Sequence, residues 1–260
     1  MQDQFSRTRA LLGHAALERL FQSSVAVFGI GGVGGYTVEA LARSGIGRIA
    51  LFDDDKICLT NLNRQIIATR ETVGQYKVDV MAARILAINP GAKVDMHRVF
   101  YGPDTADDFD LGAYDYVVDA VDTVTAKIEL ILRAGASGTP IISSMGTANK
   151  LDPTAFVVTD IFDTQQDPLA RVMRRELRKR GVDRLKVVYS KETAIPPVAD
   201  LAEECKKNCI CPPDVARTCI VRRQIPASNA FVPAVAGLIL AGEVIRDLAV
   251  QEEKNQGDVV

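Results

Sequence analysis

The segment Val25-Ala-Val-Phe-Gly-Ile-Gly-Gly-Val-Gly34 decides the fold of this chain, because an apolar run leads directly into a glycine-rich turn. Gly29, Gly31 and Gly34 have the spacing G-x-G-x-x-G, and residues 36–43 after them have a helical composition. The first glycine permits a tight turn, the second lets backbone N–H groups approach a phosphate, and the third allows close helix–strand packing. The segment, including Gly32, therefore predicts an anion-binding turn at a helix N-terminus.

The chain alternates apolar, strand-like runs with amphipathic helical segments. Strands are predicted at residues 25–28, 48–52, 94–99, 116–121 and 140–144, and helices at residues 10–20, 36–43, 75–88 and 124–136. This alternation predicts an α/β fold of the Rossmann type, with a doubly wound, mostly parallel sheet. After Gly146 the pattern loosens into a C-terminal α/β elaboration, with strands at 156–161 and 185–189 and helices at 168–180 and 231–249.

The overall composition is that of an ordinary globular protein. Of 260 residues, 47% are hydrophobic and 25% charged, and the formal net charge is −2, which excludes disordered, collagen-like and coiled-coil classes. The most apolar stretch, Phe231–Ile245, contains Pro233, Gly237, Gly242 and Glu243, so no membrane span is expected. The charged N-terminus does not resemble a secretion signal, and five cysteines do not suggest a disulfide framework. A cytoplasmic location is expected.

Polar residues follow the predicted strands at one edge of the sheet. Asp53 ends the second strand, where its carboxylate can accept hydrogen bonds from a ribose, and Asp55 follows it. Five further polar residues come after these strands: Asn61, Arg64, Gln65, Lys77 and Asp122. A dinucleotide carries only a bridging pyrophosphate, whereas the triphosphate of ATP needs added cations and a carboxylate that holds magnesium. The set therefore favours ATP over NAD.

Each of these charged residues also has an ordinary interpretation. Arg64 could form a surface salt bridge, Lys77 could lie at a solvated helix end, and Asp122 could cap a strand. Their joint position favours ligand binding, because open α/β sheets bind ligands at the carboxyl ends of their strands.

Five segments occur in a fixed order: Gly29-Ile-Gly-Gly-Val-Gly34, Leu51-Phe-Asp-Asp-Asp55, Asn61-Leu-Asn-Arg-Gln65, Val73-Gly-Gln-Tyr-Lys77 and Val118-Asp-Ala-Val-Asp122. In this order they resemble the ThiF/MoeB family of ubiquitin-activating-type adenylating enzymes. The resemblance implies that ATP activates a carboxylate as an acyl adenylate, that Asp53 holds the ribose and that Asp122 binds magnesium. It places Asn61, Arg64, Gln65 and Lys77 near the phosphates or neighbouring nucleotide groups, and makes Arg64, Lys77 and Asp122 the catalytic residues.

The resemblance also implies a homodimer, in which an N-terminal arginine of one subunit reaches the ATP of the other. Arg7 and Arg9 are the candidates, and solvated charge is the alternative for both. The implied organisation is an N-terminal helical segment at 1–24, an ATP-binding core at 25–153 and a C-terminal elaboration at 154–260, as one continuous domain.

Within the family, the chain differs from the sulfur-carrier activators, which carry two C-x-x-C pairs for zinc, because it has no such pair. Residues 147–154, Asp160, residues 166–170 and residues 189–192 resemble the tRNA threonylcarbamoyladenosine dehydratases. That subgroup implies ATP-dependent cyclisation of a threonylcarbamoyl group beside the tRNA anticodon. The alternatives are an activator of a ubiquitin-like sulfur carrier, an NAD-dependent oxidoreductase and a non-catalytic nucleotide-sensing adaptor.

The predicted helix 168–180 belongs to a strongly basic region. Residues 171–191 hold nine lysines and arginines against Glu176 and Asp183. The side chains expected to point outward from the helix are Arg171, Arg174, Arg175, Arg178 and Lys179. Such a face favours binding of a phosphate backbone, with a solvated charged surface as the alternative, and the resemblance implies that the backbone is that of tRNA.

Four cysteines are close in sequence: Cys205, Cys209, Cys211 and Cys219. They are enough for one tetrahedral zinc, and a disulfide or redox role, a catalytic thiolate or unligated thiols are alternatives. A sulfur-relay or carrier protein is a further candidate partner. Cys58, His14 and His97 are expected to be structural.

Overall fold

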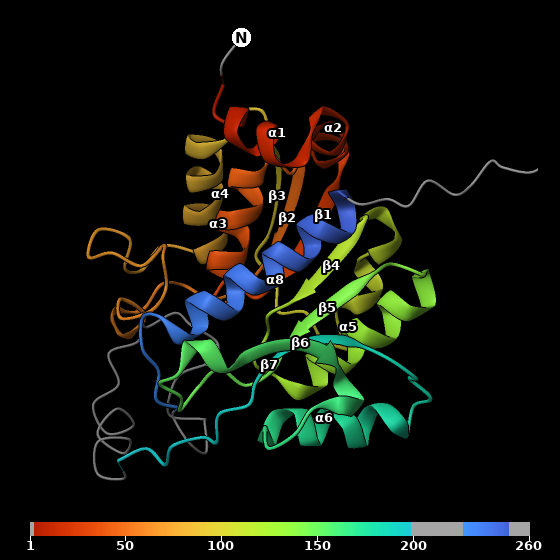
Figure 1. The fold of residues 1–260 in the computed structure, drawn as a ribbon. Coiled ribbons are helices and arrows are strands. Elements are labelled where there is room, and N and C mark those ends of the chain that lie inside the picture. The colour runs from red at the N-terminus through yellow and green to blue at the C-terminus, as the bar shows by residue number, and fades with distance from the viewer. Residues whose placement is uncertain (1–2, 199–225, 250–260) are drawn as a thin grey trace, which may run out of the picture.

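The computed structural model describes residues 3–198 and 226–249, and within them the strands form one seven-stranded sheet (Figure 1). The strands are β1 (Ser24–Phe28), β2 (Arg48–Phe52), β3 (Lys93–His97), β4 (Tyr116–Asp119), β5 (Ile141–Ser144), β6 (Phe156–Asp160) and β7 (Lys186–Ser190). Their order is β3-β2-β1-β4-β5-β7-β6, and all neighbours are parallel except β6 and β7. The predicted doubly wound, mostly parallel sheet is confirmed.

The register of the central strands places their carboxyl ends side by side. Phe28, the last residue of β1, pairs with Phe52 at the end of β2 and with Asp119 at the end of β4. The loops that follow these three strands therefore leave the sheet at one edge, and they carry the glycine-rich turn, Asp53 and Asp122.

Helices cover both faces of the sheet. Successive side chains of a strand point to opposite faces, so each face has apolar side chains that a helix can bury. Val25 and Val27 of β1 belong to the larger core with α2 (His14–Gln22), α3 (Gly34–Ser44), α4 (Lys77–Ile88) and α8 (Val232–Ala249). Ala26 and Phe28 face the opposite core with α5 (Val124–Ser137). A third core joins α5, α6 (Pro168–Arg178) and β7. This last core attaches the basic helix to the end of the sheet where β5 and β7 lie.

The N-terminal region differs from the single helix predicted at residues 10–20. It forms two helices, α1 (Ser6–Leu12) and α2, which meet at Gly13 with φ of +85°. Glycine adopts this backbone conformation without a steric penalty, so the chain can change direction there. Helix α2 buries Ala16, Leu17 and Leu20 against the core, whereas no residue of α1 is buried.

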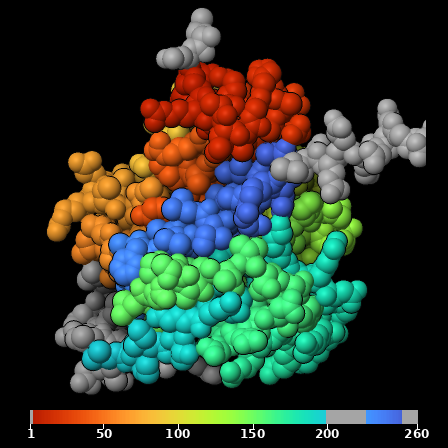
Figure 2. Space-filling view, in the orientation of Figure 1, coloured from red at the N-terminus to blue at the C-terminus, as the bar shows by residue number. Residues whose placement is uncertain are grey.

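The last helix crosses one face of the sheet (Figure 1) and packs closely on α3. In Figure 2 its blue residues lie between the red and orange N-terminal part of the chain and the green and cyan C-terminal part. A Cβ on Gly237 would lie 2.3 Å from the carbonyl oxygen of Val33, and the Thr37 hydroxyl donates a 3.0 Å hydrogen bond to the Gly237 carbonyl. Only glycine permits this approach. Among the described helices, none combines the length and apolarity needed to cross a membrane.

Candidate active site

The glycine-rich turn is as tight as its sequence predicts. Gly29 has φ of +87°, and a Cβ there would lie 2.7 Å from the Ala120 carbonyl oxygen. A Cβ on Gly34 would lie 1.8 Å from the carbonyl oxygen of Gly29, so the first turn of α3 can pack against β1 only with glycine at this position. Asp53 stabilises the turn, because its carboxylate accepts a 2.7 Å hydrogen bond from the backbone N–H of Ile30.

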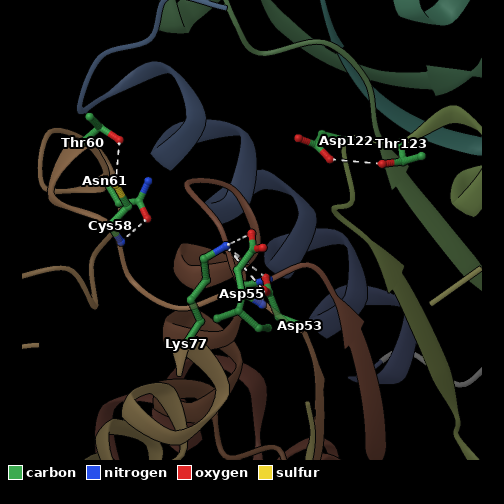
Figure 3. Close-up of polar contacts among 9 residues, drawn as sticks. Asp53, Asp55, Cys58, Thr60, Asn61, Lys77, Asp122 and Thr123 are labelled. Carbon is green, nitrogen blue, oxygen red and sulfur yellow. Dashed lines mark hydrogen bonds and ion pairs between the residues drawn. The ribbon is translucent and has the colours of Figure 1, made fainter. Parts of the chain in front are cut away.

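Lys77 links two carboxylates on the floor of this site (Figure 3). It is the first residue of α4, and its ammonium lies 2.7 Å from Asp55 Oδ2 and 3.4 Å from the Asp53 carboxylate. Burial opposes the charge on Lys77, but the two carboxylates outweigh it and raise the pKa of Lys77 above its ordinary value. Burial also raises the pKa of the Asp53 carboxyl, which Lys77 opposes. Lys77 is therefore a charged, buried group and not the solvated helix end of the ordinary interpretation.

The loop after β2 brings amide and guanidinium groups to the same place. Asn61 Oδ1 accepts a 3.0 Å hydrogen bond from the backbone N–H of Cys58, which fixes the loop, and Arg64 donates to the Thr60 carbonyl at 3.0 Å. Gln65 is only 7% exposed, and its Oε1 atom finds no hydrogen-bond partner among the described residues. A buried amide oxygen without a partner is costly, so this atom is placed to accept a hydrogen bond from a bound ligand.

Asp122 lies in the loop between β4 and α5, across from the Lys77 cluster in Figure 3. The strand ends at Asp119, two residues earlier than predicted, so Asp122 is an exposed loop residue and not a strand-end cap. The Thr123 hydroxyl donates a 3.4 Å hydrogen bond to Asp122 Oδ1. These are hard oxygen groups, which are the ligand type that magnesium prefers.

The predicted residues meet around one cavity of about 470 Å³, within the range of small-molecule sites. The predicted residues that line it are Gly29, Gly31, Gly32, Asp53, Asp55, Asn61, Arg64, Gln65, Lys77 and Asp122. Gly34 is not part of the lining, because it packs against Gly29 behind the turn. The structure therefore brings together residues that are up to 93 positions apart in the sequence, from Gly29 to Asp122.

Sequence reasoning missed part of the cavity wall. Residues 144–148, which follow β5, and Leu169 from α6 also line the cavity. The wall is supported by Lys127 of α5, which is fully buried and donates to Asp119 Oδ2 at 3.0 Å and to the Ser144 carbonyl at 2.7 Å. One feature of the sequence could have identified Lys127: it is a charged residue on the apolar side of the predicted helix 124–136.

The basic helix α6 is only partly as predicted. Arg174 does not point freely outward, because its guanidinium donates to the Thr164 carbonyl and hydroxyl groups. Hydrogen bonds from Arg180, Lys179 and Arg175 lower the pKa of Glu176 to about 2, so one ionised carboxylate offsets part of the positive charge. The exposed cations on or just after α6 are Arg171, Arg175, Arg178, Lys179 and Arg180.

Several other predicted residues lie away from the cavity. His14 is exposed on α2, and His97 is stacked on Phe52 with its ring centroid 4.3 Å away. Arg9 forms a 2.9 Å ion pair with Asp3, whereas Arg7 is exposed. The four clustered cysteines, Cys205, Cys209, Cys211 and Cys219, lie outside the described residues. Cys58 differs from these residues, because it is buried and lines the cavity.

A sequence model of the ThiF family matches residues 5–259. The chain belongs to the ThiF family. It is 46% identical over 249 residues to the tRNA threonylcarbamoyladenosine dehydratase of Bacillus subtilis, covering 95% of each chain. It is 41% identical over 207 residues to the Escherichia coli dehydratase, covering 75% of this chain and 76% of that protein. The solved structure of the E. coli dehydratase, TcdA, in complex with ATP aligns with a TM-score of 0.80 and 33% identity, over 94% of this chain and 93% of that one.

Proposed function

We propose that this ThiF family enzyme is an ATP-dependent tRNA threonylcarbamoyladenosine dehydratase, which activates the threonylcarbamoyl carboxylate and promotes its cyclisation next to the anticodon. The observation that carries the proposal is that the glycine-rich turn, the cations Arg64 and Lys77 and the exposed carboxylate of Asp122 line one cavity. The similarity to a dehydratase over 95% of both chains supports it, and so does the likeness to a dehydratase structure with ATP.

The cavity fits ATP on two observations. Gly31 and Gly32 leave the backbone open at the start of α3, where N–H groups and the helix dipole favour phosphate. Gln65 offers a buried amide oxygen that a hydroxyl or amino group of the nucleotide would satisfy. Asp53, which directly follows β2 beside this turn, is the residue that would hold the ribose.

Three charged residues would act on the phosphates. Arg64 and Lys77 provide positive charge on the cavity wall, and Asp122 with its neighbour Thr123 would hold magnesium. Bound magnesium supplies further charge neutralisation at the phosphate oxygens. The role of Lys77 depends on Asp53 and Asp55, because these carboxylates keep its ammonium protonated and hold it in place.

The chemistry needs two steps at one site. A carboxylate oxygen of the threonylcarbamoyl group forms a bond to the α-phosphorus of ATP, and pyrophosphate leaves. The carbamoyl nitrogen or oxygen then attacks the activated acyl carbon, AMP leaves and a proton passes to solvent, so the substrate loses one water overall. This ring closure is intramolecular and can gain an effective molarity of roughly 10⁵ M or more, so it needs no protein nucleophile.

The tRNA substrate would bind the exposed cations of α6, since phosphate contacts supply most of the affinity of proteins for nucleic acids. We also propose a cytoplasmic homodimer. Arg7 is the better candidate for a residue that reaches the partner, because Arg9 is already paired with Asp3. A sulfur-relay or carrier protein would be an additional partner.

Mass spectrometry of nucleosides from modified tRNA tests the proposal directly. Incubation with the protein, ATP and magnesium should remove the mass of one water from threonylcarbamoyladenosine and should release AMP and pyrophosphate. A Lys77→Met variant is the control and should cyclise the nucleoside about 10²- to 10³-fold more slowly. An unchanged nucleoside with the native chain would contradict the proposal. ATP–pyrophosphate exchange that requires a carrier protein ending in Gly-Gly would instead favour the sulfur-carrier alternative.

A further inference from the structure

A second buried ion pair joins the cavity wall to the basic helix. Lys150 and Asp167 have side chains that are 2% and 0% exposed, and their Nζ and Oδ2 atoms lie 3.0 Å apart. Neither residue lines the cavity, and neither belongs to the nucleotide-binding set described above.

One end of the pair holds the wall that follows β5. The Lys150 ammonium donates a 2.6 Å hydrogen bond to the carbonyl of Gly146, whose neighbours Thr147 and Ala148 line the cavity. A Cβ on Gly146 would lie only 2.9 Å from Asp167 Oδ2, so the carboxylate packs directly against the wall backbone. Displacement of the pair would therefore displace the wall.

The other end of the pair holds the beginning of α6. Asp167 is the N-cap of this helix, and its Oδ1 atom accepts a 2.8 Å hydrogen bond from the backbone N–H of Ala170. Leu169, in the first turn of the same helix, lines the cavity. The exposed Arg171 and Arg175 lie four and eight residues after Asp167, which is about one and two helical turns along α6. A single carboxylate thus contacts both the cavity wall and the basic helix.

The backbone on both sides of the pair is held in an unusual conformation. Asn149 and Gln166, which precede Lys150 and Asp167, have φ of 60° and 59°, and no other non-glycine residue of the described ranges has positive φ. Asn149 is fixed by three hydrogen bonds, two with the backbone of Ala227 and one from the N–H of Ile195. Such conformations persist where surrounding contacts over-determine them, typically at functional sites.

We propose that Lys150 and Asp167 are positioning residues that couple the engagement of RNA by α6 to the geometry of the substrate side of the cavity. The inference rests on the proposed function. The glycine-rich turn and Asp53 occupy the nucleotide side, so the wall at residues 146–148 remains for the group that is activated. Binding energy from remote contacts can then be used to orient the reacting carboxylate, which raises kcat and not only affinity.

The pair can be tested without unfolding the protein. Removing Lys150 alone would leave a buried, unpaired carboxylate, whereas neutralising both partners of a buried pair is often tolerated. In the Lys150→Met/Asp167→Asn variant, the introduced amide keeps a cap acceptor for α6. The control is Glu39→Gln/Arg84→Met, which removes the ion pair between α3 and α4 and also the ion pair that Glu39 forms with Arg43, and none of these three residues lines the cavity. A Lys150→Arg variant keeps the charge and should retain the coupling.

The experiment compares kcat for cyclisation at saturating tRNA in four proteins: the native chain, the pair variant, an Arg171→Glu/Arg175→Glu variant and the combination. We expect the pair variant to lose kcat by about 10-fold or more, because small misplacements of a reacting group are costly. The KM for ATP and the affinity for tRNA should stay unchanged. The α6 substitutions should lower kcat in the native background but not in the pair variant.

The outcomes separate this inference from the proposed function. If the native chain does not cyclise the nucleoside, the proposed function fails before any variant is compared. If the native chain is active and the α6 substitutions lower kcat by the same factor in both backgrounds, the pair does not couple the helix to the wall. A kcat loss in the Glu39→Gln/Arg84→Met control as large as that of the pair variant would likewise show a general structural effect and overturn the inference.

Discussion

Replacing Lys77 with Met tests whether charge balance maintains the floor of the cavity. The variant removes an ammonium that lies 2.7 Å from Asp55 and 3.4 Å from Asp53, and it keeps a side chain of similar length. Asp53 is 9% exposed, so within the described ranges its carboxylate would keep only the backbone N–H donors of Ile30 and Asp55. Breaking a buried ion pair costs about 3–5 kcal/mol, and we expect a loss of unfolding free energy in this range.

The destabilisation should depend on pH in a defined direction. Burial already raises the pKa of folded Asp53, and loss of Lys77 raises it further, while the pKa in the unfolded chain keeps its ordinary value. A group whose pKa is raised on folding stabilises the protein below its unfolded pKa, and this contribution is lost as pH rises through the folded pKa. In urea unfolding, Lys77→Met should therefore be closer to the native chain at about pH 5 than at about pH 7.

A second variant identifies the cause of the effect. Asp53→Asn combined with Lys77→Met removes the unpaired charge at position 53 and keeps an acceptor for one of the two backbone donors, Ile30 or Asp55, so part of the lost stability should return. Cyclisation should stay about 10²- to 10³-fold lower in both variants, because they lack the cation that we propose acts on the phosphates. If the double variant is no more stable than Lys77→Met, the loss comes from packing and the electrostatic reasoning is wrong.

Three other substitutions probe separate parts of the site. Asp122→Ala should abolish ATP-dependent cyclisation and leave the melting temperature unchanged, because Asp122 is exposed; activity retained at native levels would remove it from the magnesium role. Gly34→Ala should cost about 3 kcal/mol in urea unfolding, since its Cβ would lie 1.8 Å from the Gly29 carbonyl oxygen, and a native-like stability would contradict the close packing. Arg171→Glu/Arg175→Glu should weaken tRNA binding. The plot of the logarithm of the association constant against the logarithm of the salt concentration should become less steep by roughly 2, and an unchanged slope would show that RNA binds elsewhere.

The glycine-rich turn and the acids after β2 could be predicted from sequence because their interactions are local. Gly29, Gly34 and Asp53 lie within 25 positions of one another, and the strand–turn–helix order fixes how they meet. The convergence of Lys77 and Asp122 on the same cavity also followed from topology, since parallel strands place their carboxyl ends at one edge.

The opposite wall could not be predicted in the same way. Lys150 and Asp167 are 17 positions apart, with β6 between them, and they meet only because β7 pairs with β5 and places α6 beside the loop after β5. Arg174 was assigned to the outer face from helical periodicity, but its guanidinium reaches back to Thr164. Periodicity indicates which face of a helix is apolar, and it does not tell where a long side chain finds an acceptor.

Three lysines are buried in the described part of the chain, and all three border the cavity. Lys77 lines it, Lys127 donates to the carbonyl of Ser144, and Lys150 donates to the carbonyl of Gly146. Each ammonium is paired with an aspartate in or next to a loop that forms the cavity.

These pairs are poorly explained by stability alone, because the cost of desolvating two charges offsets most of their attraction, and apolar residues of similar size would serve as well. An apolar contact, however, lets a loop slide, whereas an ammonium that bonds a carboxylate together with a second carboxylate (Lys77) or a specific carbonyl (Lys127 and Lys150) fixes both distance and direction. Substrates must be held within about 0.5 Å of a productive geometry, and that requires supporting contacts of this kind. The location of all three pairs at the edge where the loops after β2, β4 and β5 converge therefore indicates that they maintain the shape of this cavity, in which we propose that ATP and the carboxylate meet.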